Sequence, residues 1–244
     1  MEGKERIILA LDGIQNLDSL NAITSRIASV VGMFKIGLEL ITRLGGPVAV
    51  TAVREKGGKI FYDGKFCDIP NTVGEAAKAT ADLGVEFFNV HANCGMAAMA
   101  AAVKNKGKSK VLVVTVLTSL SDEDCISIFG KASQQKVLEF ARMAKDAGVD
   151  GLICSPKEVP LLRSRPELKD LLLVTPGVRP EWAAAEDQKR VMTPGEAITA
   201  GSNCLVIGRP ITKPPENKFA SSVEAAMAIA EEIEGAEAKK KGGV

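Results

Sequence analysis

Three ionisable side chains stand close together at the end of an apolar run. Asp63, Lys65 and Asp68 follow residues 60–62, a β-favouring stretch that a parallel sheet would bury on both faces. Because strand side chains alternate, Asp63 and Lys65 share one face. Buried charges are costly unless they are paired, so these residues indicate a site in which carboxylates hold a protonated lysine that can donate a proton. The alternative is a structural ion pair under a loop.

The elements around these residues follow a regular order. Short β-favouring runs alternate with helical patterns, which is typical of a parallel sheet covered by helices, and 244 residues suit one large barrel. We therefore predict a single-domain (β/α)8 TIM barrel over residues 1–235, with its active site at the C-terminal ends of the strands, and a flexible tail over residues 236–244. The predicted strands are Arg6–Asp12, Met33–Gly37, Lys59–Phe66, Phe87–His91, Lys110–Leu117, Gly151–Cys154, Leu171–Val174 and Cys204–Ile207.

Local signals predict where several helices begin and end. Segments of the form Ser/Thr-x-x-Glu are typical of helix N-termini, and glycines at the end of a helical pattern are typical of C-terminal caps. The predicted N-terminal caps are Thr72, Ser155, Thr193 and Ser221, and the predicted C-terminal glycines are Gly84, Gly148, Gly201 and Gly235. For Thr72 and Ser155, which follow predicted strands, contact with a ligand is an equal alternative to capping.

A second cation reaches the site from the neighbouring strand. Lys35 lies in the second predicted strand and Asp63 in the third, so the two side chains can meet. Lys35, Asp63, Lys65 and Asp68 then form an alternating array of cations and anions. Each opposite neighbour favours the charged form, so the array keeps both lysines protonated in a dry site.

The last two predicted strands supply features that suit a phosphate group. A long loop over residues 175–193 follows the seventh strand, and loops of this kind are usually lids or binding loops. Gly208 and Arg209 follow the eighth strand. The glycine lets the backbone approach a ligand, and the arginine can hold a phosphate with two hydrogen bonds. A surface ion pair is the alternative interpretation of Arg209.

Composition excludes several other classes of protein. Net charge is +1 with 4% aromatic residues, so nothing indicates a nucleic-acid partner. The five cysteines are scattered without C-x-x-C spacing, which favours a reducing compartment. The start of the chain is charged, and no apolar run reaches membrane-spanning length, so we expect a cytoplasmic protein without a membrane partner. The single histidine, His91, makes a zinc site improbable.

At this point the motifs resemble a known family, orotidine 5′-monophosphate decarboxylase. The central motif is Asp63-x-Lys65-x-x-Asp68-Ile69-Pro70-Asn71-Thr72, and the resemblance spans residues 9–212. One departure is Gly64, where a bulky apolar residue is expected on the face turned away from the site. The other matching segments are Leu9-Ala10-Leu11-Asp12, Phe34-Lys35-Ile36-Gly37, Val174-Thr175-Pro176-Gly177-Val178-Arg179-Pro180, Asp187-Gln188-Lys189-Arg190 and Val206-Ile207-Gly208-Arg209-Pro210.

The resemblance implies conversion of orotidine 5′-monophosphate to uridine 5′-monophosphate in pyrimidine synthesis, without a metal or organic cofactor. It implies a homodimer in which Asp68 and Thr72 reach the neighbouring subunit's site. The implied catalytic residues are Lys35, Asp63, Lys65 and Asp68. The implied substrate contacts are Asp12 and Lys35 with the ribose, Ser155 with the pyrimidine, and Gln188 and Arg209 with the phosphate. Thr72, Arg179 and Gly208 are further substrate-binding residues.

Other functions on the same scaffold stay open. The nearest is a metal-dependent sugar-phosphate decarboxylase or synthase of the same superfamily, because the Asp-x-Lys-x-x-Asp motif alone is shared with it. A second is an aldolase that uses Lys65 as a Schiff-base lysine. A third is a barrel that only binds a phosphate ligand, although the full set of two lysines and two aspartates argues against lost catalysis.

Overall fold

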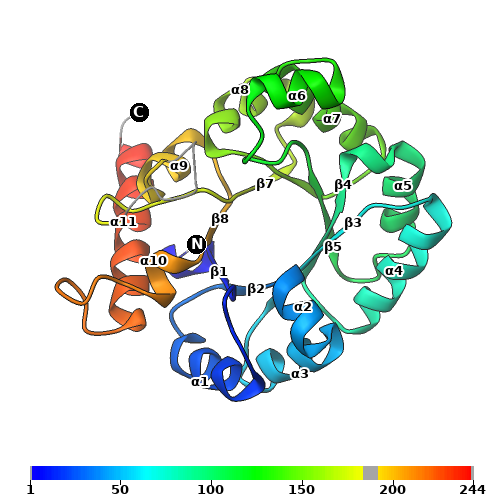
Figure 1. The fold of residues 1–244 in the computed structure, drawn as a ribbon. Coiled ribbons are helices and arrows are strands. Elements are labelled where there is room, and N and C mark those ends of the chain that lie inside the picture. The colour runs from blue at the N-terminus through cyan, green and yellow to red at the C-terminus, as the bar shows by residue number, and fades with distance from the viewer. Residues whose placement is uncertain (1, 184–191, 243–244) are drawn as a thin grey trace.

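Eight parallel strands form a closed barrel in chain order, and helices surround it (Figure 1). The structure is a computed structural model that describes residues 2–183 and 192–242. It confirms the predicted (β/α)8 barrel and all eight predicted strands, and only the ends of some strands differ. The strands are β1 (Ile7–Ala10), β2 (Met33–Gly37), β3 (Ile60–Phe66), β4 (Phe87–His91), β5 (Lys110–Val114), β6 (Gly151–Ile153), β7 (Leu172–Thr175) and β8 (Cys204–Ile207).

The connections between the strands carry the helices. They are α1 (Leu17–Ile27), α2 (Leu38–Leu44), α3 (Gly46–Glu55), α4 (Pro70–Asp82), α5 (Met96–Lys104), α6 (Asp122–Phe129), α7 (Ser133–Asp146), α8 (Val159–Arg163), α9 (Pro194–Ala200), α10 (Arg209–Thr212) and α11 (Ser222–Gly242). Short 3-10 turns include η1 (Gly3–Arg6) and η3 (Pro156–Glu158).

Most of the predicted helix caps are confirmed. Ser155 and Thr193 form complete capping boxes, and the Ser221 hydroxyl accepts a hydrogen bond from the Glu224 N–H. Gly84, Gly148 and Gly201 have positive φ angles, as C-terminal caps require. The prediction that Thr72 is an N-terminal cap is wrong, because α4 already begins at Pro70, whose fixed φ suits the first helical position.

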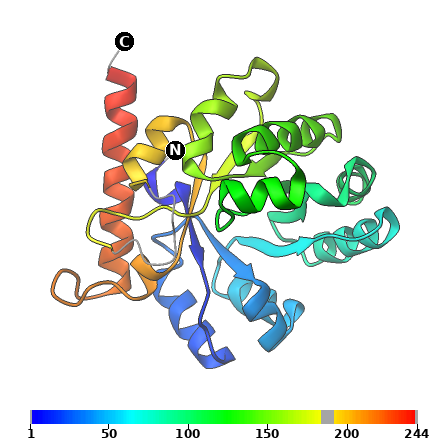
Figure 2. The ribbon, with the colours of Figure 1, turned by 45° about the horizontal axis from the view of Figure 1, so that its top comes forward.

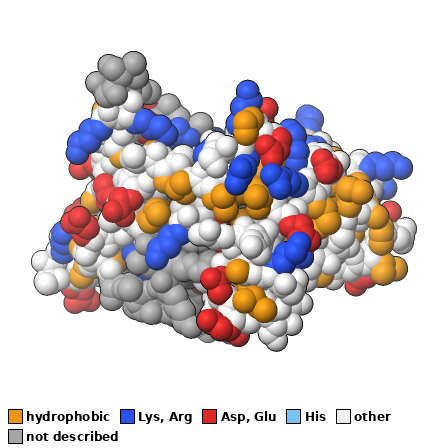
Figure 3. Space-filling model, turned by 90° about the horizontal axis from the view of Figure 1, so that it is seen from above, with side chains coloured by type: hydrophobic (Ala, Val, Ile, Leu, Met, Phe, Trp, Pro, Cys, Tyr) orange, Lys and Arg blue, Asp and Glu red, His pale blue; other side chains and the backbone are white. Residues whose placement is uncertain are grey.

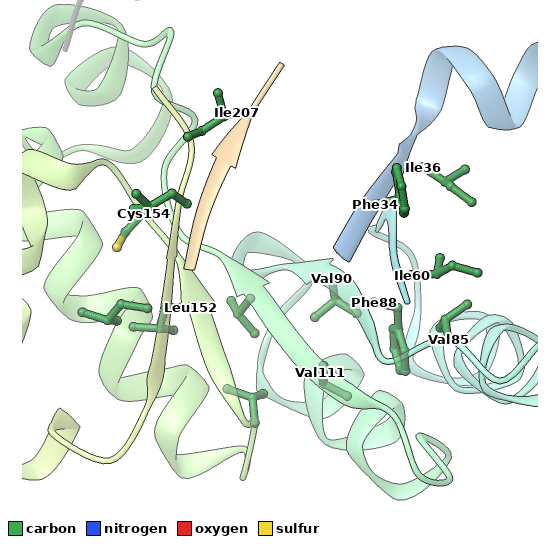
Figure 4. Close-up of a cluster of buried hydrophobic side chains, with 14 of the residues drawn as sticks. Phe34, Ile36, Ile60, Val85, Phe88, Val90, Val111, Leu152, Cys154 and Ile207 are labelled. Atoms are coloured by element: carbon green, nitrogen blue, oxygen red, sulfur yellow. The ribbon is translucent and has the colours of Figure 1, made fainter. Parts of the chain in front are cut away.

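Two apolar layers hold the barrel together. Alternate strand residues point outward and form one large core with the helices, and Figure 4 shows part of it, with Phe34, Ile60 and Phe88. The other strand residues, which alternate with the outward ones, point inward and fill the interior of the barrel, where Ile8, Phe61 and others form a second cluster. Lys35, Asp63 and Asn89 occupy inward positions nearer the C-terminal ends of their strands. The strand register therefore decides which polar side chains meet.

The last helix continues past the predicted end of the domain. The boundary at residue 235 falls inside α11, which stands along one side of the barrel (Figure 2). The prediction that Gly235 ends a helix is also wrong. Beyond it, Glu237 accepts a hydrogen bond from Arg6 Nε at 3.0 Å, and Arg6 also binds the carbonyl of Asn203. This contact ties the end of α11 to the start of the chain.

The surface is of mixed charge on the side seen in Figure 3, where lysine and arginine side chains are interspersed with acidic ones. This agrees with a net charge of +1. Among the described residues, no helix combines the length and the apolar character that crossing a bilayer requires.

The contact between Arg6 and Glu237 gives a stability prediction. Both side chains are largely buried, so Glu237→Ala leaves a buried guanidinium with one partner fewer. We expect the free energy of unfolding to fall by about 1–3 kcal/mol, measured by urea denaturation. Glu231→Ala on the exposed side of the same helix is the control, and it should change stability by less than about 0.5 kcal/mol. Equal effects of the two substitutions would show that the end of α11 does not stabilise the barrel.

Candidate active site

A cavity of about 490 Å³ opens at the C-terminal ends of the strands. This size suits a small-molecule ligand. Its lining brings together seven of the residues predicted from the sequence, which come from β1, β2, β3, β7, β8 and the segments that follow them. They are Asp12, Lys35, Asp63, Lys65, Arg179, Gly208 and Arg209.

Asp63 is the centre of the charged residues in this cavity. Its Oδ2 lies 3.1 Å from the Nζ of Lys35, and its Oδ1 lies 2.8 Å from the Nζ of Lys65. The Lys35 ammonium also lies 3.1 Å from Oδ1 of Asp12. The structure therefore shows an alternating row of Asp12, Lys35, Asp63 and Lys65. Three members of the predicted array are present, and Asp12 extends the row in place of Asp68.

The row keeps its buried members ionised. Burial by itself would lower the pKa of Lys35, but the negative charges of Asp63 and Asp12 outweigh burial, and the pKa lies above its usual value. Burial likewise would raise the pKa of Asp63, but Lys35 and Lys65, together with hydrogen bonds from Lys65 and Asn89, bring it below its usual value. At neutral pH the site therefore presents a carboxylate between two ammonium groups.

The backbone of β3 is distorted where it delivers Lys65. Tyr62 pairs with Phe88 and Phe66 with Val90, so β3 uses two more residues than β4 over this stretch. Among the described residues other than glycine, only Lys65 has a positive φ, at 50°. A left-handed backbone at such a residue costs roughly 1–3 kcal/mol, and this kind of strain is common at functional sites.

Asn89 is a polar residue of this site that the sequence analysis missed. It lies on β4 with 0% of its surface exposed. Its Oδ1 accepts a hydrogen bond from the Lys65 N–H at 2.7 Å, and its Nδ2 donates one to Asp63 Oδ1 at 2.6 Å. The sequence did carry a signal for this residue, because Asn89 is an amide at an inward position of an otherwise apolar strand, two residues before His91.

Gly64 lies on the opposite face from these charges, as predicted. A side chain there would come within 2.9 Å of the rings of both Tyr62 and Phe66. These rings lie 6.2 Å apart and occupy the space on the outer side of β3. The glycine therefore fits the helix-facing layer and does not alter the cavity.

Cations gather at the β7 and β8 side of the cavity. Arg179 follows β7, while Arg209 and Lys213 lie at the two ends of α10, and all three line the cavity. Lys213 was also missed by the sequence analysis. Gly208 precedes Arg209, and a side chain at this position would approach Ala10 on β1 at 3.5 Å. This side of the cavity is therefore suited to an anionic group such as a phosphate.

Three of the predicted residues that the structure describes, Asp68, Thr72 and Ser155, do not line the cavity. Asp68 and Thr72 are exposed, and Asp68 Oδ1 accepts a hydrogen bond from the N–H of the next residue, Ile69. Ser155 is fully buried and serves as the cap of η3, although its neighbour Cys154 lines the cavity. Gln188 lies outside the described residues.

Substitution of Asp63 gives a pH-dependent prediction. Asp63→Asn leaves the buried ammonium of Lys35 and the partly exposed ammonium of Lys65 without their shared counter-ion, and we expect the free energy of unfolding at pH 7 to fall by about 3–5 kcal/mol. Because the pKa of Asp63 is lower in the folded state than in the unfolded state, its contribution is complete above about pH 5 and is lost as the pH falls from there through the folded-state value.

Urea denaturation of both proteins between pH 7 and pH 3 tests this expectation. The difference in stability between wild type and Asp63→Asn should shrink as the pH decreases below about 5. A difference that stays constant over this range would mean that Asp63 is not held ionised by the lysines.

Comparison with known proteins agrees with this geometry. The family described as Orotidine 5′-phosphate decarboxylase / HUMPS matches residues 5–223. A protein from Moorella thermoacetica named orotidine 5′-phosphate decarboxylase is 44% identical over 96% of this chain and 94% of its own length. One of the same name from Geotalea uraniireducens is 42% identical, with coverages of 95% and 96%. The crystal structure of orotidine 5′-phosphate decarboxylase from Lactobacillus acidophilus superposes with a TM-score of 0.78 at 36% identity, and the match covers 93% of this chain and 98% of that one. The resemblance seen in the motifs is thereby confirmed, and the chain belongs to the orotidine 5′-phosphate decarboxylase / HUMPS family.

Proposed function

We propose that this protein decarboxylates orotidine 5′-monophosphate to uridine 5′-monophosphate and carbon dioxide in pyrimidine biosynthesis. The observation that carries the proposal is the Asp63 carboxylate held between the ammonium groups of Lys35 and Lys65 at the base of a nucleotide-sized cavity. Curated relatives that share 42–44% of their residues with this chain bear the name of this enzyme.

The geometry fits the chemistry of the reaction. Breaking the bond between ring carbon 6 and the carboxylate releases carbon dioxide and leaves the electron pair on carbon 6. An ammonium group fixed beside that carbon stabilises the developing negative charge. Lys65 then donates a proton to carbon 6 and takes one back from water, so the reaction consumes one proton overall. Asp63, which Lys35 holds in turn, keeps the Lys65 ammonium in place, and the mechanism needs no metal or organic cofactor.

The remaining residues have proposed roles in binding the nucleotide. We assign Asp12 and Lys35 to the ribose hydroxyl groups and Arg179, Gly208 and Arg209 to the phosphate, and the position of all five residues in the cavity lining supports this assignment. Binding energy from the phosphate is remote from the reacting carbon and can stabilise the transition state. Two further contacts are proposed on the family resemblance, Ser155 with the pyrimidine and Gln188 with the phosphate.

A metal-dependent sugar-phosphate decarboxylase or synthase is less favoured by the site. Two carboxylates line the cavity in the described chain: both oxygens of Asp63 are engaged by ammonium groups, and Oδ1 of Asp12 is engaged by Lys35. A divalent cation bound at Asp63 would have to displace one of these lysines. Loss of the orotidylate absorbance band on adding EDTA-treated protein distinguishes the two activities, because chelation would abolish the metal-dependent one.

We also propose that the active unit is a homodimer. Asp68 and Thr72 are exposed beside the cavity instead of lining it. Leu38, Ile69 and Met96 follow three neighbouring strands and are each more than half exposed. Apolar side chains gathered on one rim are typical of a surface that another chain covers. A second copy placed there would receive Asp68 and Thr72 in its own site.

The proposed location is the cytoplasm. None of the five cysteines, all of which the structure describes, forms a disulfide, and Cys125 and Cys154 are buried. This use of cysteine suits a reducing compartment.

Replacement of Lys65 tests the proposed activity directly. Lys65→Ala removes the proton donor and the local cation, so turnover should fall by several orders of magnitude, measured as loss of orotidylate absorbance. Lys78→Ala on the exposed side of α4 is the control, with activity equal to wild type. If Lys65→Ala kept more than about a tenth of wild-type activity, a loss below ~1.4 kcal/mol, Lys65 would not be the proton donor.

Mixing of two inactive variants tests the shared site. Lys65→Ala and Asp68→Asn are each expected to be almost inactive as homodimers. After subunit exchange, one site of each heterodimer has both residues intact, so about a quarter of wild-type activity should return for equal amounts. If heterodimers form, as shown by differently tagged subunits, and activity does not return, Asp68 serves its own subunit.

A further inference from the structure

We propose that Asn89 is a positioning residue for decarboxylation, which joins Asp63 to Lys65 and so fixes the Lys65 ammonium at the reacting carbon. The inference rests on the proposed function of the same site. Asn89 does not line the cavity, so it acts through its two neighbours and not on the substrate.

The distortion of β3 creates the need for such a residue. Between the pairs Tyr62–Phe88 and Phe66–Val90, three residues of β3 face the single residue Asn89 of β4. The regular ladder of backbone hydrogen bonds is interrupted in this stretch. A buried backbone N–H requires a partner, and the side-chain oxygen of Asn89 accepts the one from Lys65 at 2.7 Å. Asn89 thereby supports the left-handed backbone of Lys65.

The other end of the same amide holds Asp63. Its Nδ2 lies 2.6 Å from Oδ1 of Asp63, and this oxygen also lies 2.8 Å from the Lys65 ammonium. The contacts form a closed ring that starts at the Lys65 N–H, passes through Asn89 and Asp63, and returns to Lys65 Nζ. The side-chain ammonium is thus fixed relative to its own backbone.

An amide suits this position because of its asymmetry. Lys65 presents a donor and Asp63 an acceptor, so the bridging group must accept at one end and donate at the other. A carboxylate at residue 89 would accept at both ends, and an apolar side chain would do neither. Asn89 is fully buried, so water does not readily take its place.

A second asparagine offers a matched control at the other end of the barrel. The Oδ1 of Asn203 accepts the N–H of Leu173 in β7 at 2.8 Å, and it also binds Arg163 at 2.6 Å. Asn203 therefore joins a strand N–H to a charged side chain, as Asn89 does. It lies at the start of β8, at the end of the barrel opposite to the cavity.

The test compares Asn89→Ala, Asn89→Asp and Asn203→Ala. We expect Asn89→Ala to lower kcat by ~100-fold, because small displacements of catalytic groups have effects of this size. Its affinity for uridine 5′-monophosphate should change by less than about threefold, since the contacts that bind the nucleotide stay in place. Asn203→Ala should lower the thermal midpoint and leave kcat within about twofold of wild type.

The pH profile separates positioning from general destabilisation. Asp63 is faced by Lys35 from β2 and by Lys65 from β3, while Asp12 contacts Lys35, and His91 lies further along β4. Loss of the Asn89 hydrogen bond raises the pKa of Asp63, so the fall of kcat in acid should begin at higher pH in Asn89→Ala. In Asn89→Asp the fall of kcat should begin at a still higher pH, because two adjacent carboxylates share a proton and the pKa of one of them is raised.

Two outcomes would overturn the inference. One is a kcat of folded Asn89→Ala within about threefold of that of Asn203→Ala. The other is an acid limb of Asn89→Asp that coincides with that of wild type. Asn89→Asp keeps the side-chain volume and the acceptor for the Lys65 N–H, so it decides the matter if Asn89→Ala does not fold. If Lys65→Ala is inactive and the Asn89 variants are fully active, only the inference about Asn89 is wrong. If Lys65→Ala is active, the proposed mechanism itself is wrong.

Discussion

Asp63, a buried carboxylate between two ammonium groups, holds together the charged residues at the C-terminal end of this barrel. Asp63 is 6% exposed and Lys35 9% exposed, and neither charge would be tolerated there alone. Together with Lys65 and Asp12 they satisfy one another, so the cations stay protonated at the base of the cavity. A barrel suits this arrangement, because its strands bring residues that are distant in sequence to one end and exclude water around them.

Holding these charges requires a departure from regular strand geometry. A regular β3 would place Lys65 by simple alternation, but the strand carries extra residues here and Lys65 takes a left-handed backbone. The cost is tolerated because Asn89 replaces the missing backbone partner and the outer rings of Tyr62 and Phe66 close the space beside Gly64. The hydrogen bond from Asn89 therefore supports the strained residue Lys65 on the inner side of β3, while the rings of Tyr62 and Phe66 pack on its outer side.

The cavity has two chemically different sides. Asp63 and Lys65 lie at its base near β3, whereas Arg179, Arg209 and Lys213 lie near β7 and β8. A ligand with a reactive group at one end and an anionic group at the other can contact both sides of the cavity at once, which is why the proposed nucleotide substrate suits the site. Asp68 lies outside, on a rim with exposed apolar residues, and this position is the reason for proposing that a second chain completes the site.

Sequence reasoning predicted the barrel, its eight strands and seven of the residues that line the cavity at its C-terminal end, whereas Asp68, Thr72 and Ser155 were predicted there and do not line it. These predictions follow from alternating apolar patterns and from charged residues at strand ends, both of which are local signals. Only the tertiary structure showed that Asn89 joins Lys65 to Asp63, that Asp12 extends the charged row, and that Ser155 is a buried cap. It also showed that α11 runs past Gly235, because Glu237 there meets Arg6 from the first turn of the chain. Such facts depend on register and on pairs of residues far apart in sequence, which no local pattern encodes.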